Sequence, residues 1–480
     1  MVNMRAVERD QQFLMPPSVS DWLPENHLAW FIVDLVAELD LTGLYGSLRS
    51  DGRGGASYHP EMMLAVLLYA YCVGERSSRR IERRLVEDVA FRVVAANQCP
   101  DHATLARFRA RHREAVAGLF SQVLGLCVSE GLVQAGVVAI DGTKVEANAS
   151  AWSNRTRRQI AEEILDEADA VDAAEDDQFG DRRGDELPQK WAGRHDRRSR
   201  LREALCQLDA EGAADWESYM AEREAKEAEF GRKLPGRKPS KGSDHRGKTR
   251  QANVTDPDSR MLRARNRFVQ GYNAQAAVSE DHIVVAAELT NAANDSTQLI
   301  PMIDPVRQNL AEGETPEVGV FVADAGYWSA ENLSQLGDVD VLVAPMPATT
   351  GIIDPTDPRR KQREAVIERV EAGELTITQA ARAMGVSPTW ARKLVNDHRR
   401  GVPDPARLRA EMEDRLASDT GAAAYAKRKT TVEPVFGNLK ANLGFRRFSQ
   451  RGLDAVHSEW RLICTVHNLL KLHRHRLAAT

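Results

Sequence analysis

The chain has 480 residues, which is too long for one ordinary domain, so about two or three domains are expected. Its five cysteines are odd in number and lack metal-ligand spacing, which argues against a disulfide framework and favours the reducing cytoplasm. No signal pattern opens the sequence, and no apolar run reaches the roughly 20 residues of a membrane-spanning helix. The motifs of ATP-binding glycine loops, zinc proteases and serine hydrolases are missing, which argues against these enzyme classes.

The net charge of −5 hides a separation of charge along the chain. Residues 161–187 contain twelve Asp or Glu and two Arg, whereas residues 231–250 contain eight Lys or Arg and one Asp. Residues 427–480 contain eleven Lys or Arg and three Asp or Glu. Such segregation predicts a basic face that binds DNA. The alternative, a set of solvated helix faces, explains the block at 231–250 equally well.

Residues 1–133 are predicted to form an N-terminal helical domain. Apolar residues recur at helical spacing in four segments, at 28–41, 60–73, 77–95 and 104–130. Asp101 precedes the last segment and has the character of a helix cap. The arginines of 78–84 form a basic face, which fits either a DNA-binding domain or an ordinary helical bundle with solvated arginines.

Two apolar runs further along the chain read as buried strands, and each ends in an aspartate. They are residues 136–141, ending in Asp141, and residues 318–324, ending in Asp324. A carboxylate at the end of a core strand is held by a rigid element and still reaches a cleft. Taken singly, however, such an aspartate is more often a turn former or a helix cap.

The predicted catalytic core is interrupted by two insertions. Its first parts are residues 134–150 and 251–345, and the latter contains a predicted hairpin of strands 268–278 and 283–289. The first insertion, residues 151–250, is highly charged. It is predicted to contain helical segments at 155–174 and 197–230 and a basic Pro/Gly/Ser linker at 234–242.

The second insertion, residues 346–424, contains a candidate helix-turn-helix at 365–399. An alanine-rich helix is followed by a turn at Gly385 and by a second helix that begins at Pro388. The second helix carries two candidate DNA-binding residues, Arg392 and Lys393. A compact helical insertion that packs on the core without binding DNA is an equally good interpretation.

Residues 425–480 complete the core and contain an acid in basic surroundings. Glu433 and Lys440 are seven residues apart, so a helix would place them on one face. Four further cations flank the glutamate, namely Arg428, Lys429, Arg446 and Arg447. A carboxylate that binds a divalent metal beside cations that bind phosphates is what phosphodiester chemistry needs. A final amphipathic helix is predicted at 454–476.

Asp141, Asp324 and Glu433 are predicted to converge as oxygen ligands. Two hard cations about 3.5–4 Å apart need oxygen ligands and open positions for a phosphate and a nucleophile. One cation then activates the attacking oxygen, and the other stabilises the leaving oxygen. For Asp295, a helix cap is the simpler interpretation, and a position near the metal ions is the alternative.

The three acids and their neighbours resemble the DDE transposases of bacterial insertion sequences. The motifs are DGTKVEAN at 141–148, ADAGY at 323–327 and VEPVFG at 432–437, and the spacing of Glu433 and Lys440 matches the glutamate-lysine signature of that family. Further stretches also resemble the family, at 62–71, 101–109, 290–296 and 467–471. The helix-turn-helix segment at 365–399 departs from the family pattern.

The resemblance implies an α/β fold: an RNase H-like core, with a mixed sheet flanked by helices, joined to the N-terminal helical domain and the two helical insertions. It implies metal-dependent DNA strand cleavage and strand transfer, with binding of terminal inverted repeats and target DNA. Asp141, Asp324 and Glu433 would bind two Mg²⁺ ions, for which Mn²⁺ could substitute. Further residues would contact the DNA, namely Thr143, Lys144, Arg428, Lys429, Lys440, Arg446 and Arg447.

The resemblance also implies a homodimer or a higher synaptic complex, because two element ends must be joined. It further implies a location in the bacterial cytoplasm, associated with the nucleoid. Two other functions stay open. One is a DNA-binding regulator with a decayed active site, against which the complete set of three acids argues. The other is a hydrolytic nuclease of the same fold that performs no strand transfer.

Overall fold

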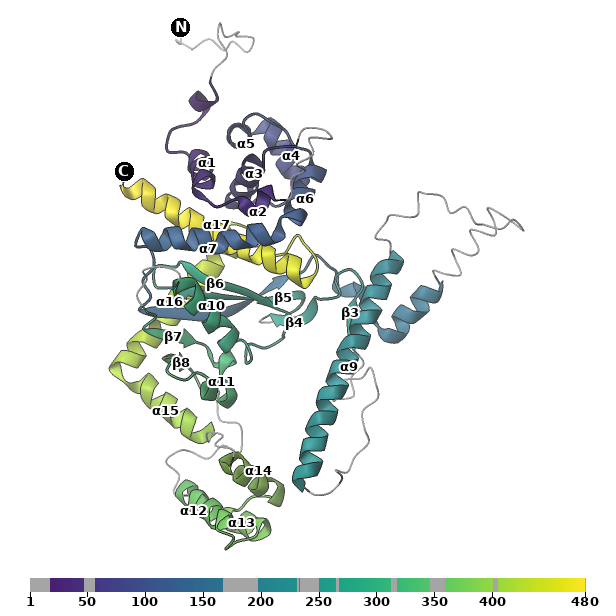
Figure 1. Cartoon of the computed structure of the whole chain (residues 1–480), viewed down its shortest axis with the longest axis vertical. Coiled ribbons are helices and arrows are strands. Elements are labelled where there is room, and N and C mark those ends of the chain that lie inside the picture. Colours follow the sequence, from purple (N-terminus) through teal and green to yellow (C-terminus); the bar gives the residue numbers. More distant parts are fainter. Residues whose placement is uncertain are drawn as a thin grey trace, which may run out of the picture.

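The computed structural model describes residues 18–46, 57–166, 197–230, 233, 250–264, 267–311, 317–345, 359–399 and 405–479. A six-stranded mixed sheet lies at its centre (Figure 1). The strands of this sheet are β1 (Val137–Glu146), β4 (Arg260–Ala264), β5 (Arg267–Ser279), β6 (Val284–Thr290), β7 (Val320–Ala323) and β8 (Val341–Val343). The predicted α/β class, both predicted buried strands and the predicted hairpin are therefore confirmed.

The strand order brings the ends of the two predicted strands together. β5 pairs antiparallel with β1 on one edge and with β4 and β6 on the other. β1, β7 and β8 are parallel neighbours. In the β1–β7 ladder Ile140 is the partner of Ala323, so Asp141 and Asp324 follow side by side. The apolar side chains of β1, and those of residues 321–323 in β7, are buried, as the uninterrupted hydrophobic runs predict.

The N-terminal region is helical, as predicted, but two predicted helices are each divided in two. Its elements are η1 (Val19–Trp22), α1 (Leu28–Glu38), α2 (Thr42–Tyr45), α3 (Pro60–Cys72), α4 (Ser78–Glu87), α5 (Val89–Val94), α6 (His102–Arg111) and α7 (Arg113–Ser129). The segment 77–95 breaks at Asp88, whose extended backbone and side chain cap α5. The segment 104–130 breaks at His112, and Asp101 caps α6 as predicted, accepting a hydrogen bond from the Thr104 amide at 2.6 Å.

The last helix, α17 (Leu453–Ala479), joins the N-terminal helices to the sheet. It packs against α3, α7 and β6, and Figure 1 shows it running beside α7. Trp460 donates an indole hydrogen bond to the Gln275 carbonyl at 2.9 Å. Buried residues from both regions form one continuous hydrophobic core, so the N-terminal helices and the sheet are stabilised together.

The remaining helices of the core surround the sheet. They are α10 (Leu299–Ala311), η3 (Ala325–Tyr327), α11 (Ala330–Gln335), α15 (Pro405–Ala417), α16 (Asp419–Gly437) and the π-helical turn η4 (Asn438–Asn442). Of these, α16 packs on β1, β5 and β7, so its residues lie over the ends of the strands that carry Asp141 and Asp324. Among the described residues, no helix is long and apolar enough to cross a membrane.

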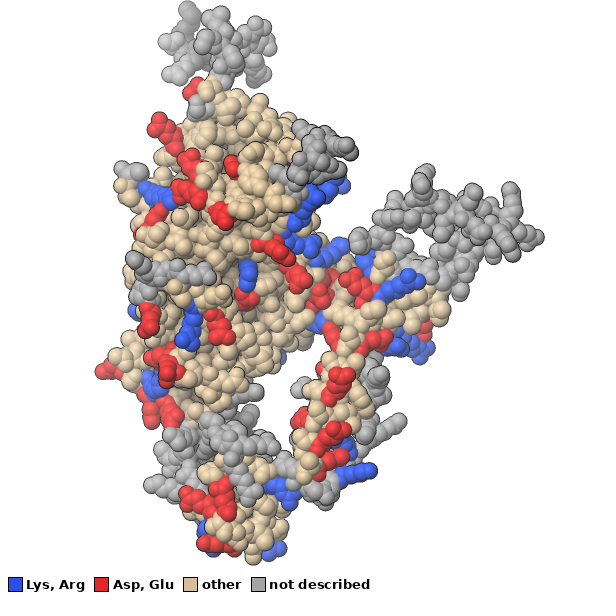
Figure 2. Space-filling model, in the orientation of Figure 1, with Lys and Arg blue, Asp and Glu red and all other residues tan. Residues whose placement is uncertain are grey.

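The first insertion forms an arm with a small core of its own. The short strands β2 (Asn154–Thr156) and β3 (Gln251–Asn253) pair at its base, after the turn η2 (Ala151–Ser153). The helix α9 (Arg197–Phe230) agrees with the prediction and projects away from the core (Figures 1 and 2). The linker 234–242 and most of both charged blocks of this insertion lie outside the described residues.

The second insertion contains a three-helix unit made of α12 (Arg359–Glu371), α13 (Ile377–Met384) and α14 (Pro388–Arg399). The two helices predicted on either side of Gly385 are present, and α12 precedes them. The unit lies at the opposite end of the molecule from the N-terminal helices (Figure 1). Its buried apolar side chains form a cluster that is separate from the main core.

Candidate active site

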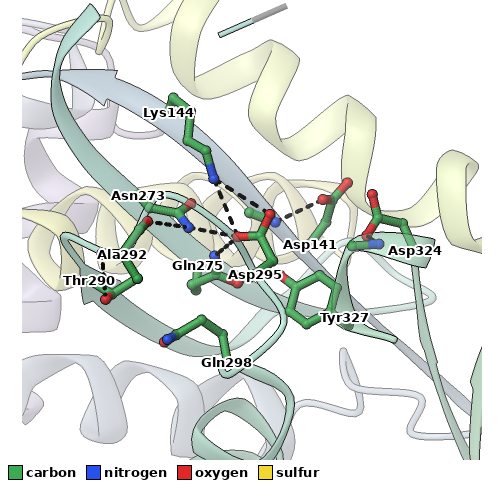
Figure 3. A network of polar contacts seen from close by, with 12 residues as sticks. Asp141, Lys144, Asn273, Gln275, Thr290, Ala292, Asp295, Gln298, Asp324 and Tyr327 are labelled. Carbon is green, nitrogen blue, oxygen red and sulfur yellow. Dashed lines mark hydrogen bonds and ion pairs between the residues drawn. The ribbon is translucent and has the colours of Figure 1, made fainter. Parts of the chain in front are cut away.

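Asp141 and Asp324 form a pair of carboxylates at the ends of adjacent parallel strands (Figure 3). The Gly142 amide donates to Asp141 Oδ1 at 2.8 Å, and the Gly326 amide donates to Asp324 Oδ1 at 2.8 Å. Asp324 also caps the short turn η3. Both aspartates are partly exposed, so the strand ends present two oriented acids to an approaching ligand.

The surroundings of Asp141 disfavour its negative charge. Burial, the neighbouring Asp324 carboxylate and the more distant Asp295 raise the pKa of Asp141 to about 6, although the Gly142 hydrogen bond and Arg428 act in the opposite direction. Two carboxylates this close repel each other when both are ionised. A cation placed between them would remove that repulsion.

Arg428 supplies one positive charge from α16. Its guanidinium lies 3.6 Å from Asp141 Oδ2, with 11% of the side chain exposed, and it lies over the ring of Tyr425. Its Nε atom is buried and has no hydrogen-bond partner among the described residues. Arg428 is therefore directed at the acid pair and not at the open surface. The DNA contact predicted for it stays a prediction.

Lys440 reaches the strand that carries Asp141. Its Nζ donates to Thr143 Oγ1 at 2.6 Å and to the Lys144 carbonyl at 2.8 Å. The two regular helical turns expected between Glu433 and Lys440 are not present, because α16 ends at Gly437 and a π-helical turn follows. The wider turn changes the direction of Lys440 relative to an unbroken α-helix. Lys440 and Thr143, both of which were expected to contact DNA, are nevertheless brought together.

Asp295 belongs to a polar network beside the acid pair (Figure 3). Its Oδ1 accepts hydrogen bonds from Asn273 at 2.6 Å and Gln275 at 2.7 Å, and Lys144 Nζ lies 3.3 Å away. Tyr327 donates its hydroxyl hydrogen bond to the Gln275 side chain. The interpretation of Asp295 as a helix cap is therefore wrong. Lys144, which was expected to contact DNA, is only 14% exposed and pairs with Asp295.

This network was not found from the sequence, although one signal for it exists. Asn273 and Gln275 are fully buried polar residues two positions apart on β5, so they share one face of the strand. Buried amides need partners. That pattern could have indicated a polar site on this face, but it could not have identified Asp295, which comes from the loop after β6.

Glu433 is the one predicted ligand that the structure does not bring to the pair. It lies on α16 between Arg428 and Lys440, and its side chain is exposed. Within the described ranges, no three acidic, histidine or cysteine side chains are close enough to hold a metal ion together. The Asp141–Asp324 pair itself fits a hard divalent cation, because it offers two adjacent carboxylates whose repulsion such an ion would remove. The role of Glu433 as a ligand stays a prediction.

The other predicted DNA contacts lie on two different parts of the molecule. Lys429 is exposed on α16. Arg446 donates to the Lys440 carbonyl at 3.0 Å, and Arg447 pairs with Glu146 at 3.0 Å, so both exposed arginines lie close to the Lys440 turn. Two more predicted contacts, Arg392 and Lys393, belong to α14 in the separate three-helix unit.

Comparison with known protein families yields two matches. Residues 245–469 match the transposase DDE domain, and residues 17–111 match a transposase domain, DUF772. No curated protein and no solved structure matches the chain. The DDE match contains Asp324 and Glu433 but begins after Asp141, which joins the site through the β1–β7 pairing.

Proposed function

We propose that this chain, which belongs to the DDE transposases of insertion sequences, cuts DNA at the ends of its own mobile element and joins those ends to target DNA. Its core has the RNase H-like fold of that family. The observation that carries this proposal is the Asp141–Asp324 pair at the ends of two adjacent parallel strands. The acid pair favours a cation, and Lys440 is held beside it by Thr143 of the strand that carries Asp141. This arrangement suits chemistry on a phosphodiester.

Asp141 and Asp324 are the residues that would hold the divalent ion, and Glu433 is proposed as a third ligand. Mg²⁺, or Mn²⁺ in its place, supplies Lewis-acid activation of the attacking oxygen and stabilisation of the leaving oxygen when bound. The protein groups around the pair are proposed to position the two carboxylates. The Asp295 network fixes Gln275 and Lys144 behind the pair, and Gly142 and Gly326 orient the two carboxylates.

The phosphate backbone is proposed to bind along the turn that follows α16. Lys440, held by Thr143, would place its ammonium beside the phosphate next to the scissile bond. Lys429, Arg446 and Arg447 are exposed and would contact neighbouring phosphates. Arg428 would balance the charge of Asp141 within the site.

The DNA partners are proposed to be the terminal inverted repeats of the element and a target duplex. Joining two ends requires that they be held together, so the working form is proposed to be a dimer or a larger synaptic complex in the cytoplasm, at the nucleoid. A nuclease of the same fold would cut these substrates without joining them.

A strand-transfer assay tests the proposal against the nuclease alternative. Labelled duplexes that carry the element ends are incubated with full-length protein, Mg²⁺ and a circular target plasmid. Label covalently joined to the plasmid is expected with the wild type and is lost with Asp141→Asn. Asp304→Asn, which makes the same chemical change at an exposed position on α10, serves as the matched control and should retain joining. Cleavage without any joined product would overturn the transposase reaction in favour of hydrolysis.

A further inference from the structure

The three-helix unit at 359–399 is built as a small folding unit of its own. Val366, Ile367 and Val370 of α12 pack with side chains of the two following helices, namely Ala380, Ala381, Met384, Ala391 and Val395. These eight buried residues form a cluster that contains no residue of the main core. The distribution of buried apolar side chains therefore does not support the alternative, in which the insertion is stabilised by packing on the core.

The connection between α13 and α14 is tightly specified. α13 begins with a capping box, in which the side chains of Thr376 and Gln379 each bond the backbone of the other residue. It ends at Gly385, whose φ of 66° is left-handed. Only residues 385–387 separate the two helices, and Ser387 Oγ accepts a hydrogen bond from the Trp390 amide at 3.2 Å. The result is a helix, a short glycine turn and a second capped helix, the arrangement that presents a recognition helix to DNA.

One face of α14 is turned away from the small core. Ala391 and Val395 are fully buried on the face toward that core, whereas Trp390, 39% exposed, lies on one flank of the helix and Arg392 and Asn396, partly exposed, lie on the other. An aromatic ring, a guanidinium and an amide on the flanks of a helix that enters a groove are groups that read base edges or bind phosphates.

Charge is distributed unevenly within the unit. Residues 359–399 contain nine Lys or Arg and five Asp or Glu. Four of the acids, including Glu371 and Glu374, lie on α12 or directly after it, and the fifth is Asp397 near the end of α14. α12 carries five of the cations among its acids, whereas α13 and the first two turns of α14 carry Arg382, Arg392 and Lys393 without an acid, which suits a polyanion.

We propose that the three-helix unit is a second DNA-binding site of this chain, in which α14 enters the major groove of duplex DNA and reads its sequence. The site is separate from the strand-cleavage centre, since its helices share no core with the sheet that carries Asp141 and Asp324. It adds sequence recognition to the proposed function and does not depend on the cleavage chemistry. Arg392 is the residue that we expect to carry most of the discrimination.

The test is a binding selection with the full-length chain and a pool of random-sequence duplexes, in EDTA so that no cleavage takes place. The wild type should enrich a defined sequence motif. Arg392→Ala should weaken binding to that motif at least about tenfold relative to a scrambled duplex. Arg369→Ala removes one positive charge from α12 in the same unit and should leave the preference within about twofold.

A second variant and a fold control keep the outcome clear. Arg392→Lys retains the charge but loses the planar guanidinium, so it should keep most of the salt-dependent affinity and lose the sequence preference. Far-UV circular dichroism should show all variants folded. The proposal is overturned if the wild type enriches no motif, or if folded Arg392→Ala selects the same motif with unchanged preference. Neither result would bear on cleavage at Asp141, which is measured in a separate assay with Mg²⁺.

Discussion

Arg428 on α16 lies 3.6 Å from Asp141 on β1 and provides a positive charge within the chain beside the acid pair. Its guanidinium is nearly buried, and the two aspartates would repel each other more strongly without it. This relationship links α16 to the strand ends and lowers the electrostatic cost of keeping two acids side by side.

Replacing Arg428 by Gln should destabilise the metal-free protein by about 1–3 kcal/mol, because Asp141 loses its partner. Addition of Mg²⁺ should then raise the melting temperature of the variant by more than that of the wild type. Thermal unfolding with and without Mg²⁺ measures both effects. Arg409→Gln on the neighbouring α15, where Arg409 pairs with Glu413, is the matched control. Equal Mg²⁺ shifts in Arg428→Gln and the wild type would contradict the proposed compensation.

Gly142→Ala should lower the free energy of unfolding by about 1–3 kcal/mol, because the added methyl group overpacks the network. A Cβ at this position would clash with the Gln275 side-chain nitrogen and lie 2.9 Å from Asp295 Oδ1. Urea unfolding gives the change in free energy. Gly118→Ala is the control: nothing lies within 4 Å of its added methyl group, and alanine favours the surrounding helix α7. A fully tolerated Gly142→Ala would show that the network is not tightly packed.

Glu459 holds the segment that follows Lys440. It is 1% exposed and accepts hydrogen bonds from the backbone amides of Ser449 and Gln450, each at 2.9 Å, and from Tyr71 of the N-terminal region at 3.4 Å. Glu459→Gln loses one acceptor oxygen and should cost about 1–3 kcal/mol. Hydrogen exchange of residues 444–450 should become faster than in the wild type.

The control for this prediction is Asp454→Asn, an exposed acid on the same helix α17, which should leave the exchange of residues 444–450 unchanged. If Glu459→Gln also leaves that exchange unchanged, the segment is held by other contacts. Faster exchange confined to the variant would show that this buried carboxylate holds the segment after Lys440 in place.

His467 should make stability depend on pH in the acid range. Burial lowers the pKa of His467 to about 4, and its ring is held by the His282 carbonyl and by Asn438. Because the pKa is lower in the folded state, the unfolded chain binds more protons between pH 6.5 and 4, so stability falls as pH falls through that window. The loss is about 3 kcal/mol at the acid end.

Urea unfolding at several pH values tests this dependence. Between pH 6.5 and 4, the free energy of unfolding should fall less steeply in His467→Gln than in the wild type. The difference in slope against pH should correspond to up to about one bound proton. His475→Gln, at an exposed histidine of the same helix, should follow the wild type. Parallel curves for His467→Gln and the wild type would rule out a contribution from His467.

The elements that were predicted correctly are those with local signals. The apolar runs before Asp141 and Asp324, the capping residue Asp101 and the glycine turn at Gly385 each act within a few residues of chain. Hydrophobic periodicity and capping chemistry are read directly from such stretches. The convergence of Asp141 with Asp324 was predicted because each ends a buried strand, and the structure shows that the parallel pairing of β1 with β7 produces it.

The features that were missed depend on contacts between distant segments. Asp295 reaches Asn273 and Gln275 only because the β5–β6 hairpin returns the chain along β5, which carries both amides. The π-helical turn that carries Lys440 departs from α-helical spacing, which no periodicity in so short a segment predicts. The contact of Arg428 with Asp141, which lies 287 positions earlier in the sequence, was not predicted, and the DNA contact predicted for Arg428 stays a prediction.

The most direct test of the central claim is Mg²⁺-dependent cleavage of end-labelled DNA that carries the element ends. We predict cleavage by the wild type and by Asp304→Asn, and loss of cleavage by at least about a hundredfold in Asp141→Asn, Asp324→Asn and Glu433→Gln, all with retained DNA binding. Wild-type cleavage that persists in Asp141→Asn and Asp324→Asn would contradict the assignment of the active site to this acid pair.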